Sequence, residues 1–350
     1  MLIFEKAIQN MSTRMSQLKI DKSRCTHNRS RLSKCSKCID ICPVDGIEIR
    51  NKNVIIKDNC IECGLCAGVC PTDSIRIQEP TEKNLYSYME KQARQNEDII
   101  LTCNRNENTN NDSFKVPCLG SLSLEFLIGL DILPVNANVL YKNENCMNCE
   151  VKRGIETYLE NLKKMRAVKE ILEIEVSSIV HMEKAPKKKR KKINRDQEVD
   201  EERRDFLSSI FKTTKNLPNI AIGQILGDGS KKEKSRAIVS NPIFKKYKIL
   251  SDISKELREE GVMDRELIYY NKPYLKDDCK LCGACSLLCP MGALTMEEKE
   301  DEKILMLNNE LCSGCELCTE VCYHKSLGME NKNLYDFSNN DLFIIAKEEK

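Results

Sequence analysis

The 350-residue sequence contains no tryptophan, and aromatic residues make up only 5% of it. Other apolar residues are also scarce, because the hydrophobic share of 41% includes 20 cysteines, whereas globular domains usually reach about 45–50%. A chain of this length predicts two or three domains. The shortage of bulky apolar side chains excludes a large hydrophobic core in each, so we expect cores that are partly filled by something other than side chains.

Long hydrophobic runs are absent as well. No stretch approaches the roughly 18 apolar residues that a membrane-spanning helix needs, and residues 1–6 have neither the apolar core nor the cleavage site of an export signal. Secreted disulfide frameworks do not show the cysteine spacing described below. We therefore expect a soluble, cytoplasmic protein with reduced cysteines.

Fingerprints of an enzyme with its own substrate are missing too. The sequence has no nucleotide-binding glycine motif, no flavin site and no Ser-His-Asp set, and its three histidines are isolated: His27, His181 and His324. The net charge of +2 does not indicate nucleic-acid binding. Residues 184–192 are strongly basic, but they lack interleaved aromatic residues for base stacking. We interpret them as part of a charged linker, which makes a nucleic-acid partner unlikely.

The 20 cysteines carry the strongest pattern in the sequence. Three runs share the spacing C-x2-C-x2-C-x3-C, and a fourth repeats it more loosely: Cys60, Cys63, Cys66 and Cys70; Cys279, Cys282, Cys285 and Cys289; Cys312, Cys315, Cys318 and Cys322; and, more loosely, Cys25, Cys35, Cys38 and Cys42. This spacing is typical of 4Fe-4S clusters, where three thiolates wrap one cube and the fourth reaches a neighbouring one. A zinc ribbon lacks the third cysteine at the next step. The runs therefore predict two pairs of clusters.

Residues around the cysteines suit tight loops. Gly64, Gly283 and Gly314 lie between cysteines and allow close backbone approach and positive φ. A proline follows the fourth cysteine of three runs and fixes the bend there, while Tyr323 takes this place in the last run.

Because of these cysteine runs, residues 25–79 and residues 275–330 each resemble a bacterial-type two-cluster ferredoxin domain. The two segments together make up about a third of the chain. The resemblance implies four 4Fe-4S clusters, electron transfer and crossed ligation. By position, it implies four ligand sets: Cys25, Cys35 and Cys38 with Cys70; Cys60, Cys63 and Cys66 with Cys42; Cys279, Cys282 and Cys285 with Cys322; and Cys312, Cys315 and Cys318 with Cys289. The chain departs from the family where nine residues instead of two separate Cys25 from Cys35. We expect this longer loop to make its cluster the more labile of the pair.

Between residues 82 and 182 the pattern changes to alternating helices and strands. Helical periodicity covers residues 84–95, 122–130 and 151–172, and apolar strands cover residues 98–102 and 138–141. This alternation predicts a small α/β domain with a parallel sheet. Four cysteines fall near strand or loop ends, where such sheets hold ligands, and we predict that they form one further metal site: Cys103, Cys118, Cys146 and Cys149.

The stretch Val116-Pro-Cys118-Leu-Gly120 and the apolar helix after it resemble the small iron-sulfur domain of the heterodisulfide reductase and methyl-viologen-hydrogenase delta type. This resemblance spans about 80 residues and implies an iron-sulfur cluster, which we expect to be 2Fe-2S. Four thiolates would also satisfy zinc, and buried structural thiols are the remaining alternative.

Together these patterns predict an α+β multidomain protein in which two two-cluster ferredoxin domains flank a small parallel α/β domain. Residues 46–56 predict a hairpin with a closing strand at residues 74–77, and residues 293–296 and 304–307 predict the same layout in the second ferredoxin domain. The predicted divisions are an N-terminal extension with a short helix (1–24), a ferredoxin domain (25–79), the α/β domain (82–182), a charged linker (183–205), a helical connecting segment (206–270), a second ferredoxin domain (271–331) and a C-terminal tail (332–350).

This organisation predicts an electron-transfer protein that relays electrons to or from a partner oxidoreductase and has no catalytic site of its own. One alternative is an iron-sulfur subunit with a direct catalytic role. A nucleic-acid-binding protein with structural clusters is the other.

Overall fold

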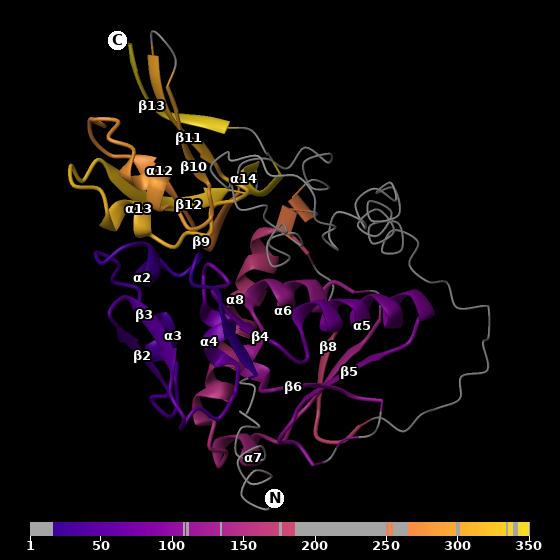
Figure 1. Cartoon of the computed structure of the whole chain (residues 1–350). Coiled ribbons are helices and arrows are strands. Elements are labelled where there is room, and N and C mark those ends of the chain that lie inside the picture. The colour runs from indigo at the N-terminus through magenta and orange to yellow at the C-terminus, as the bar shows by residue number, and fades with distance from the viewer. Residues whose placement is uncertain are drawn as a thin grey trace, which may run out of the picture.

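A computed structural model describes residues 17–107, 109, 112–133, 135–174, 177–185, 250–251, 253–254, 265–298, 302–333, 335–338 and 342–349. These residues form three units: the N-terminal unit (17–79), the middle unit (82–185) and the C-terminal unit (265–349). In Figure 1 the C-terminal unit lies above the N-terminal unit, and the middle unit lies beside them. The arrangement is α+β, with a parallel sheet only in the middle unit.

The N-terminal unit contains the predicted hairpin, formed by β2 (Ile47–Arg50) and β3 (Asn53–Ile56). Both turn residues, Asn51 and Lys52, have positive φ, at 51° and 68°. Positive φ at both positions is what a type I′ turn needs, and its twist matches that of the two strands. The hairpin prediction is confirmed.

A second antiparallel ribbon closes this unit, where β1 (Leu18–Ile20) pairs with β4 (Ile75–Ile77). The short helix predicted within residues 1–24 is therefore wrong where the structure describes the chain, because Leu18 and Ile75 bury their side chains in one small core. Residues 1–16 lie outside the described residues. Three short helices accompany the cysteine loops: α2 (Thr26–Arg29), α3 (Lys37–Asp40) and α4 (Leu65–Val69).

The middle unit is the predicted α/β domain. Its sheet has the order β6-β5-β7-β8, and all its strand pairs are parallel. The strands are β5 (Ile99–Cys103), β6 (Phe114–Val116), β7 (Ala137–Leu140) and β8 (Ile179–Met182). The helices are α5 (Glu82–Gln95), the 3₁₀ turn η1 (Leu119–Ser121), α6 (Leu124–Asp131), α7 (Asn143–Met147) and α8 (Lys152–Ile171). The central strands β5 and β7 are buried, except for Cys103 at the end of β5, because helices cover the sheet (Figure 1).

The C-terminal unit is larger than predicted. A three-stranded sheet, β10-β11-β13, packs beside the pair β12-β9. Its strands are β9 (Glu266–Leu275), β10 (Leu294–Glu298), β11 (Glu302–Asn308), β12 (Leu327–Asn333) and β13 (Leu342–Glu349). Its helices are α12 (Ala284–Leu288), α13 (Leu317–Glu320) and α14 (Tyr335–Ser338). The predicted strand pair at 293–296 and 304–307 is confirmed by β10 and β11.

Two predicted divisions need correction at this end of the chain. Residues 266–270 belong to strand β9 and not to a helical connecting segment, although residues 250–251 and 253–254 are helical. Residues 342–349 are a strand of the C-terminal sheet and not a tail, because β13 pairs with β11 along its whole length. Most of the charged linker and of the connecting segment lies outside the described residues.

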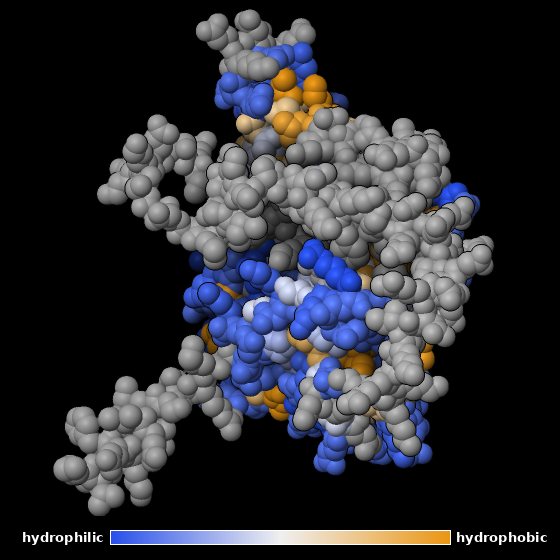
Figure 2. All heavy atoms as spheres, turned by 90° about the vertical axis from the view of Figure 1, so that its right-hand side faces the viewer, coloured by the Kyte–Doolittle hydropathy of each residue, from blue (hydrophilic) through white to orange (hydrophobic). Residues whose placement is uncertain are grey.

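The surface of the middle unit is mostly polar (Figure 2), in agreement with the low share of apolar residues in the sequence. Figure 2 shows mostly hydrophilic side chains over the middle unit, and apolar side chains near the outer end of the C-terminal sheet. Leu342 and Ile344 of β13 are 49% and 61% exposed there. Within the described residues, no helix combines the length and the apolar character needed to cross a membrane.

Candidate iron-sulfur centres

In the N-terminal unit, the structure brings Cys70 to the first three cysteines of the looser run. Burial, followed by the charges of the neighbouring Cys70, Cys35 and Cys25, raises the pKa of Cys38 to about 12. Burial also raises the pKa of Cys25, and Cys70 and Cys35 add to this effect. The last cysteine of one run thus lies with the first three of the other.

Cys42, the last cysteine of the looser run, lies with the first three cysteines of the second run, Cys60, Cys63 and Cys66. Burial raises the pKa of both Cys60 and Cys63, and the Cys42 thiol adds to the shift in each. The pKa of Cys66 is raised by burial and then by neighbours that include Cys63, Cys42 and also Cys38. Because Cys38 belongs to the other group, the two groups of four meet where Cys38 and Cys66 face each other.

The C-terminal unit shows the same exchange, because its eight cysteines line two cavities in groups of four. One cavity is lined by Cys279, Cys282, Cys285 and Cys322, and the other by Cys289, Cys312, Cys315 and Cys318. Apolar side chains complete both linings, among them Met296 and Leu305 in the first and Met291 and Leu307 in the second. Because each cavity is lined by four sulfurs, both suit the same group.

The chemistry of these sulfurs fits a bound metal cluster. Burial is the main cause that raises the pKa of Cys285 and of Cys315, in each case to about 12. Such thiols are protonated at neutral pH, whereas the thiolate is the form that binds metal. A positively charged centre among the four sulfurs offsets the cost of burying thiolates. The residues present therefore fit iron-sulfur clusters.

A turn after the fourth cysteine recurs in all four runs. The third residue beyond that cysteine has positive φ each time: Asp45 at 51°, Asp73 at 49°, Gly292 at 64° and Lys325 at 54°. In three runs the next backbone N–H donates to the sulfur of that cysteine: Gly46 to Cys42 at 3.1 Å, Ser74 to Cys70 at 3.3 Å and Ser326 to Cys322 at 3.3 Å. Hydrogen bonds to sulfur stabilise its charged form and tune cluster potentials. The sequence analysis missed this turn, although aspartate and glycine at that position favour it.

Within the three regular runs, the loop has two left-handed residues, one on each side of the second cysteine. They are Glu62 and Gly64 in one run, Leu281 and Gly283 in the next, and Gly314 and Glu316 in the last. The sequence suggests that the three glycines have the same role. In the structure they do not, because Gly314 precedes the second cysteine of its run, whereas Gly64 and Gly283 follow it. Each loop places glycine at one of its two left-handed residues and leaves a side chain at the other, where the conformation is less favourable.

The four cysteines of the middle unit also come together. Cys103 ends β5, Cys118 follows β6, and Cys146 and Cys149 lie in and just after α7. Burial, followed by the charges of Cys103 and Cys149, raises the pKa of Cys146 to about 11. Burial also raises the pKa of Cys118 to about 12, with Cys103, Cys63 and Cys149 among the smaller causes. A methyl group on Gly154 of α8 would lie 2.4 Å from the Cys118 sulfur, so only glycine leaves this sulfur its space.

Histidines contribute less than the cysteines. Nε2 of His27 lies 2.5 Å from the carbonyl oxygen of Cys35, and Nε2 of His181 lies 2.9 Å from the Tyr158 hydroxyl. His324 lines the cavity of the Cys279 group. In the part of the chain that the structure describes, no three Cys, His, Asp or Glu side chains are close enough to share a single metal ion. In the C-terminal unit the sulfurs instead surround two cavities, which suits a cluster of several atoms better than a single ion.

Comparison with known proteins agrees with this geometry. A family model described as a 4Fe-4S dicluster domain matches residues 33–74 and 278–326. These two segments contain the cysteine groups of the N-terminal and C-terminal units apart from Cys25. Two dicluster domains hold four 4Fe-4S clusters.

Curated relatives include the pyruvate synthase subunit PorD of Methanothermobacter marburgensis, which is 39% identical over 62 residues, or 17% of this chain and 68% of PorD. An uncharacterized ferredoxin of Methanocaldococcus jannaschii is 37% identical over 70 residues, or 19% of this chain and 39% of its own. The uncharacterized ferredoxin-like protein YdhY of Escherichia coli K12 is 32% identical over 66 residues, or 18% of this chain and 31% of its own. With two dicluster segments and four groups of four cysteines, the chain belongs to the family of 4Fe-4S dicluster ferredoxins and is a polyferredoxin-like iron-sulfur protein.

Proposed function

We propose that this chain relays electrons between a partner oxidoreductase and a second redox protein through four 4Fe-4S clusters and one centre in the middle unit. The observation that supports this proposal is the exchange of the fourth cysteine within each terminal unit, because two clusters that share ligands in this way lie side by side. Neighbouring clusters pass electrons without bond making. Ferredoxin-like domains support electron transfer as the general activity.

The ligand sets that we propose are the crossed ones. Three cysteines of one run and the last cysteine of its partner run hold each cluster: Cys25, Cys35, Cys38 and Cys70; Cys60, Cys63, Cys66 and Cys42; Cys279, Cys282, Cys285 and Cys322; and Cys312, Cys315, Cys318 and Cys289. We name these the Cys25, Cys60, Cys279 and Cys312 centres.

For the middle unit we propose a fifth centre on Cys103, Cys118, Cys146 and Cys149, with iron and sulfide as 2Fe-2S. Zinc is the second candidate, but among the described residues no three such side chains lie close enough to share a single ion. The proximity of Cys63 to Cys118 supports the iron-sulfur form, because the site then lies next to the Cys60 centre, where a redox-active group can exchange electrons and zinc cannot.

All twenty cysteines are free of disulfides, which supports a reducing compartment, and we propose the cytoplasm.

The partner that we propose is a multi-subunit oxidoreductase. PorD is named as a subunit of pyruvate synthase, and this chain matches 68% of its length. The match covers 17% of this chain, so we propose the kind of partner and not its substrate.

The general activity is tested with the isolated chain. After anaerobic reduction, we expect it to reduce a one-electron acceptor such as methyl viologen or a ferredoxin without any substrate, and to contain about sixteen irons and sixteen sulfides from its four cubes. A 2Fe-2S centre in the middle unit raises both counts by about two. Protein that contains only zinc, or that cannot be reduced, would overturn the proposal.

Crossed ligation predicts opposite damage from two matched variants. Cys70→Ser is expected to change the spectrum of the Cys25 centre and to leave the Cys60 centre intact, because the Cys70 sulfur lies with Cys38 and Cys25. Cys42→Ser is expected to do the reverse. Paramagnetic resonance of the reduced protein distinguishes the two centres. If each variant damages the centre of its own run, the ligation is not crossed.

Gly154→Ala tests the fifth centre. The added methyl group would lie 2.4 Å from the Cys118 sulfur, so this sulfur must move and we expect the centre to be lost while the other four remain. Glu156→Ala, at an exposed residue of the same helix, is the control. Iron, sulfide and zinc analysis identifies what is lost. Wild-type protein that contains no metal beyond its four cubes would show that the four thiols bind nothing, and unchanged metal content in Gly154→Ala would contradict the role given to Gly154.

A further inference from the structure

The nine residues between Cys25 and Cys35 contact the C-terminal unit. The guanidinium of Arg29 donates to the carbonyl oxygens of Leu287 at 2.6 Å, Leu288 at 3.3 Å and Cys289 at 3.5 Å. These carbonyls end helix α12, where backbone oxygens lack partners within the helix and carry partial negative charge. An arginine there satisfies several of them at once. Arg29 in turn donates its backbone N–H to the carbonyl oxygen of Cys25 at 3.0 Å.

A second contact from the same loop repeats the link. The backbone N–H of Lys34, next to Cys35, donates to Oε1 of Glu320 at 3.1 Å. Glu320 ends helix α13, which carries Cys318. Through Arg29 and Lys34 the loop therefore contacts the carbonyl of Cys289 and the helix that carries Cys318, and both cysteines belong to the Cys312 centre. This loop, which departs from the regular spacing, is the docking segment of the N-terminal unit.

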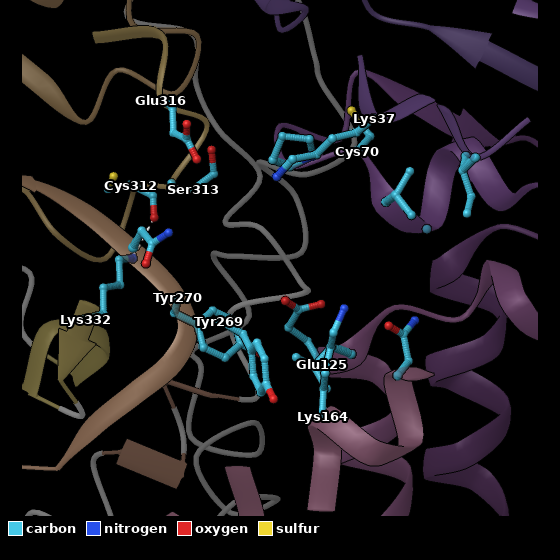
Figure 3. Close-up of a pocket in the computed structure, with 18 of the residues that line it drawn as sticks. Lys37, Cys70, Glu125, Lys164, Tyr269, Tyr270, Cys312, Ser313, Glu316 and Lys332 are labelled. Atoms are coloured by element: carbon cyan, nitrogen blue, oxygen red, sulfur yellow. Dashed lines mark hydrogen bonds between the residues drawn. The ribbon is translucent and has the colours of Figure 1, made fainter. Parts of the chain in front are cut away.

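The cavity between the units brings the same two centres face to face. Cys70 of the Cys25 centre and Cys312 of the Cys312 centre both line this cavity. Figure 3 shows them on opposite walls, Cys70 beside Lys37 and Cys312 beside Ser313. The neighbours across the unit boundary are thus the Cys25 and Cys312 centres.

On the other side of the N-terminal unit, Arg105 makes a corresponding link to the middle unit. Its guanidinium donates to the carbonyl oxygen of Ile61 at 2.9 Å and to that of Pro117 at 3.1 Å, and it pairs with Glu150 at 2.9 Å. Ile61 lies between two cysteines of the Cys60 centre, and Pro117 precedes Cys118.

The backbones approach closely at this second boundary. A methyl group on Gly68 of α4 would lie 2.8 Å from the Ser121 carbonyl oxygen, and one on Gly120 would lie 2.7 Å from the Leu65 side chain. Helix α4 carries Cys66, and η1 follows Cys118 directly. The Cys60 centre is therefore the neighbour of the middle site.

We propose that Arg29 and Arg105 are positioning residues that join the three units into one electron path, with the centres in the order Cys279, Cys312, Cys25, Cys60 and the middle site. This inference rests on the proposed function. One electron moves at each step, the donor centre is oxidised, the next centre is reduced, and no bond forms or breaks. A one-electron donor and a one-electron acceptor serve the two ends of the path.

The Cys279 end of the path reaches the surface. Cys282 of this centre is the exposed cysteine among the twenty, although its neighbour Cys285 is buried. Tyr323, which follows Cys322 of the same centre, is 89% exposed. At the other end, the four cysteines of the middle site are half-buried. We therefore expect electrons to enter or leave most readily at the Cys279 centre.

The test uses the full chain with all centres reduced by dithionite. Adjacent reduced centres interact magnetically, which broadens their paramagnetic resonance signals and speeds their spin relaxation. Arg29→Ala is expected to remove the interaction between the two terminal units. The spectrum then becomes the sum of one from the two centres of the C-terminal unit and one from the centres of the N-terminal and middle units, with iron and sulfide unchanged. Arg31→Ala, at an exposed arginine of the same loop, is the matched control.

Three further variants keep the test decisive. Arg29→Lys retains one charged donor and is expected to keep part of the magnetic interaction between the terminal units. Glu320→Ala removes the contact with the backbone N–H of Lys34 and is expected to weaken the same interaction. Arg105→Ala is expected to separate the middle site from the Cys60 centre only. Full metal content with unchanged interaction in Arg29→Ala and Glu320→Ala would overturn the path while leaving electron transfer intact. Loss of iron in wild-type protein would instead count against the proposed function.

Discussion

Removing iron with an anaerobic chelator is expected to unfold the N-terminal unit while the parallel sheet of the middle unit stays folded. The buried side chains of the main apolar core of the N-terminal unit are Leu18, Ile47, Val54 and Ile75 with two cysteines, and other isoleucines pack against them half-buried. Ordering the backbone costs about 1–2 kcal/mol per residue, which so few side chains cannot offset over residues 17–79. Metal binding supplies the missing folding free energy, so its loss removes the fold.

Hydrogen exchange measures this difference within one sample. After iron removal we expect the amides of the β2–β3 hairpin to exchange as in an unfolded chain. The amides of β5 and β7 should keep their protection, because Ile99, Leu101, Ala137 and Val139 are fully buried under helices. Protein that is refilled with iron and sulfide should regain the protection of the hairpin. A hairpin that stays protected without iron would show that the side chains suffice.

Asp131→Ala is expected to destabilise the middle unit by about 3–5 kcal/mol, as for other buried ion pairs that lose one partner. Asp131 ends α6, is 1% exposed and forms an ion pair with Lys169 of α8. Its Oδ1 also accepts the backbone N–H groups of Ser178 and Ile179, both at 3.0 Å. One carboxylate thus ties two helices to the start of β8, and its removal leaves the buried Lys169 ammonium without its ion pair.

Lys164→Ala is the matched control for this prediction. Lys164 lies on the same helix and pairs with Glu160, but the side chains are 32% and 63% exposed. Exposed pairs contribute about 0.2–1 kcal/mol, so this variant should change little. The opening free energy of the β7 amides, from hydrogen exchange, reports the middle unit separately from the others. Equal effects of the two variants would contradict the role given to Asp131.

The cysteine runs, the two dicluster segments and the β2–β3 hairpin could be predicted because each depends on residues close together in sequence. Cysteine spacing determines how sulfurs are presented within one loop, and Asn51 with Lys52 suits the tight turn of the hairpin. The alternation of helices and strands likewise predicted the parallel sheet of the middle unit. Local periodicity was enough for each of these elements.

Tertiary structure alone decided the elements whose partners are distant. Strand β1 pairs with β4, and β13 with β11, across intervals that no local pattern specifies. The approach of Cys118 to Cys103, Cys146 and Cys149 depends on the order of strands in the sheet. Arg29 and Arg105 look like ordinary surface residues in the sequence, and their roles arise only when three units dock. Pairing and docking free energies come from contacts between distant residues, which spacing along the chain does not encode.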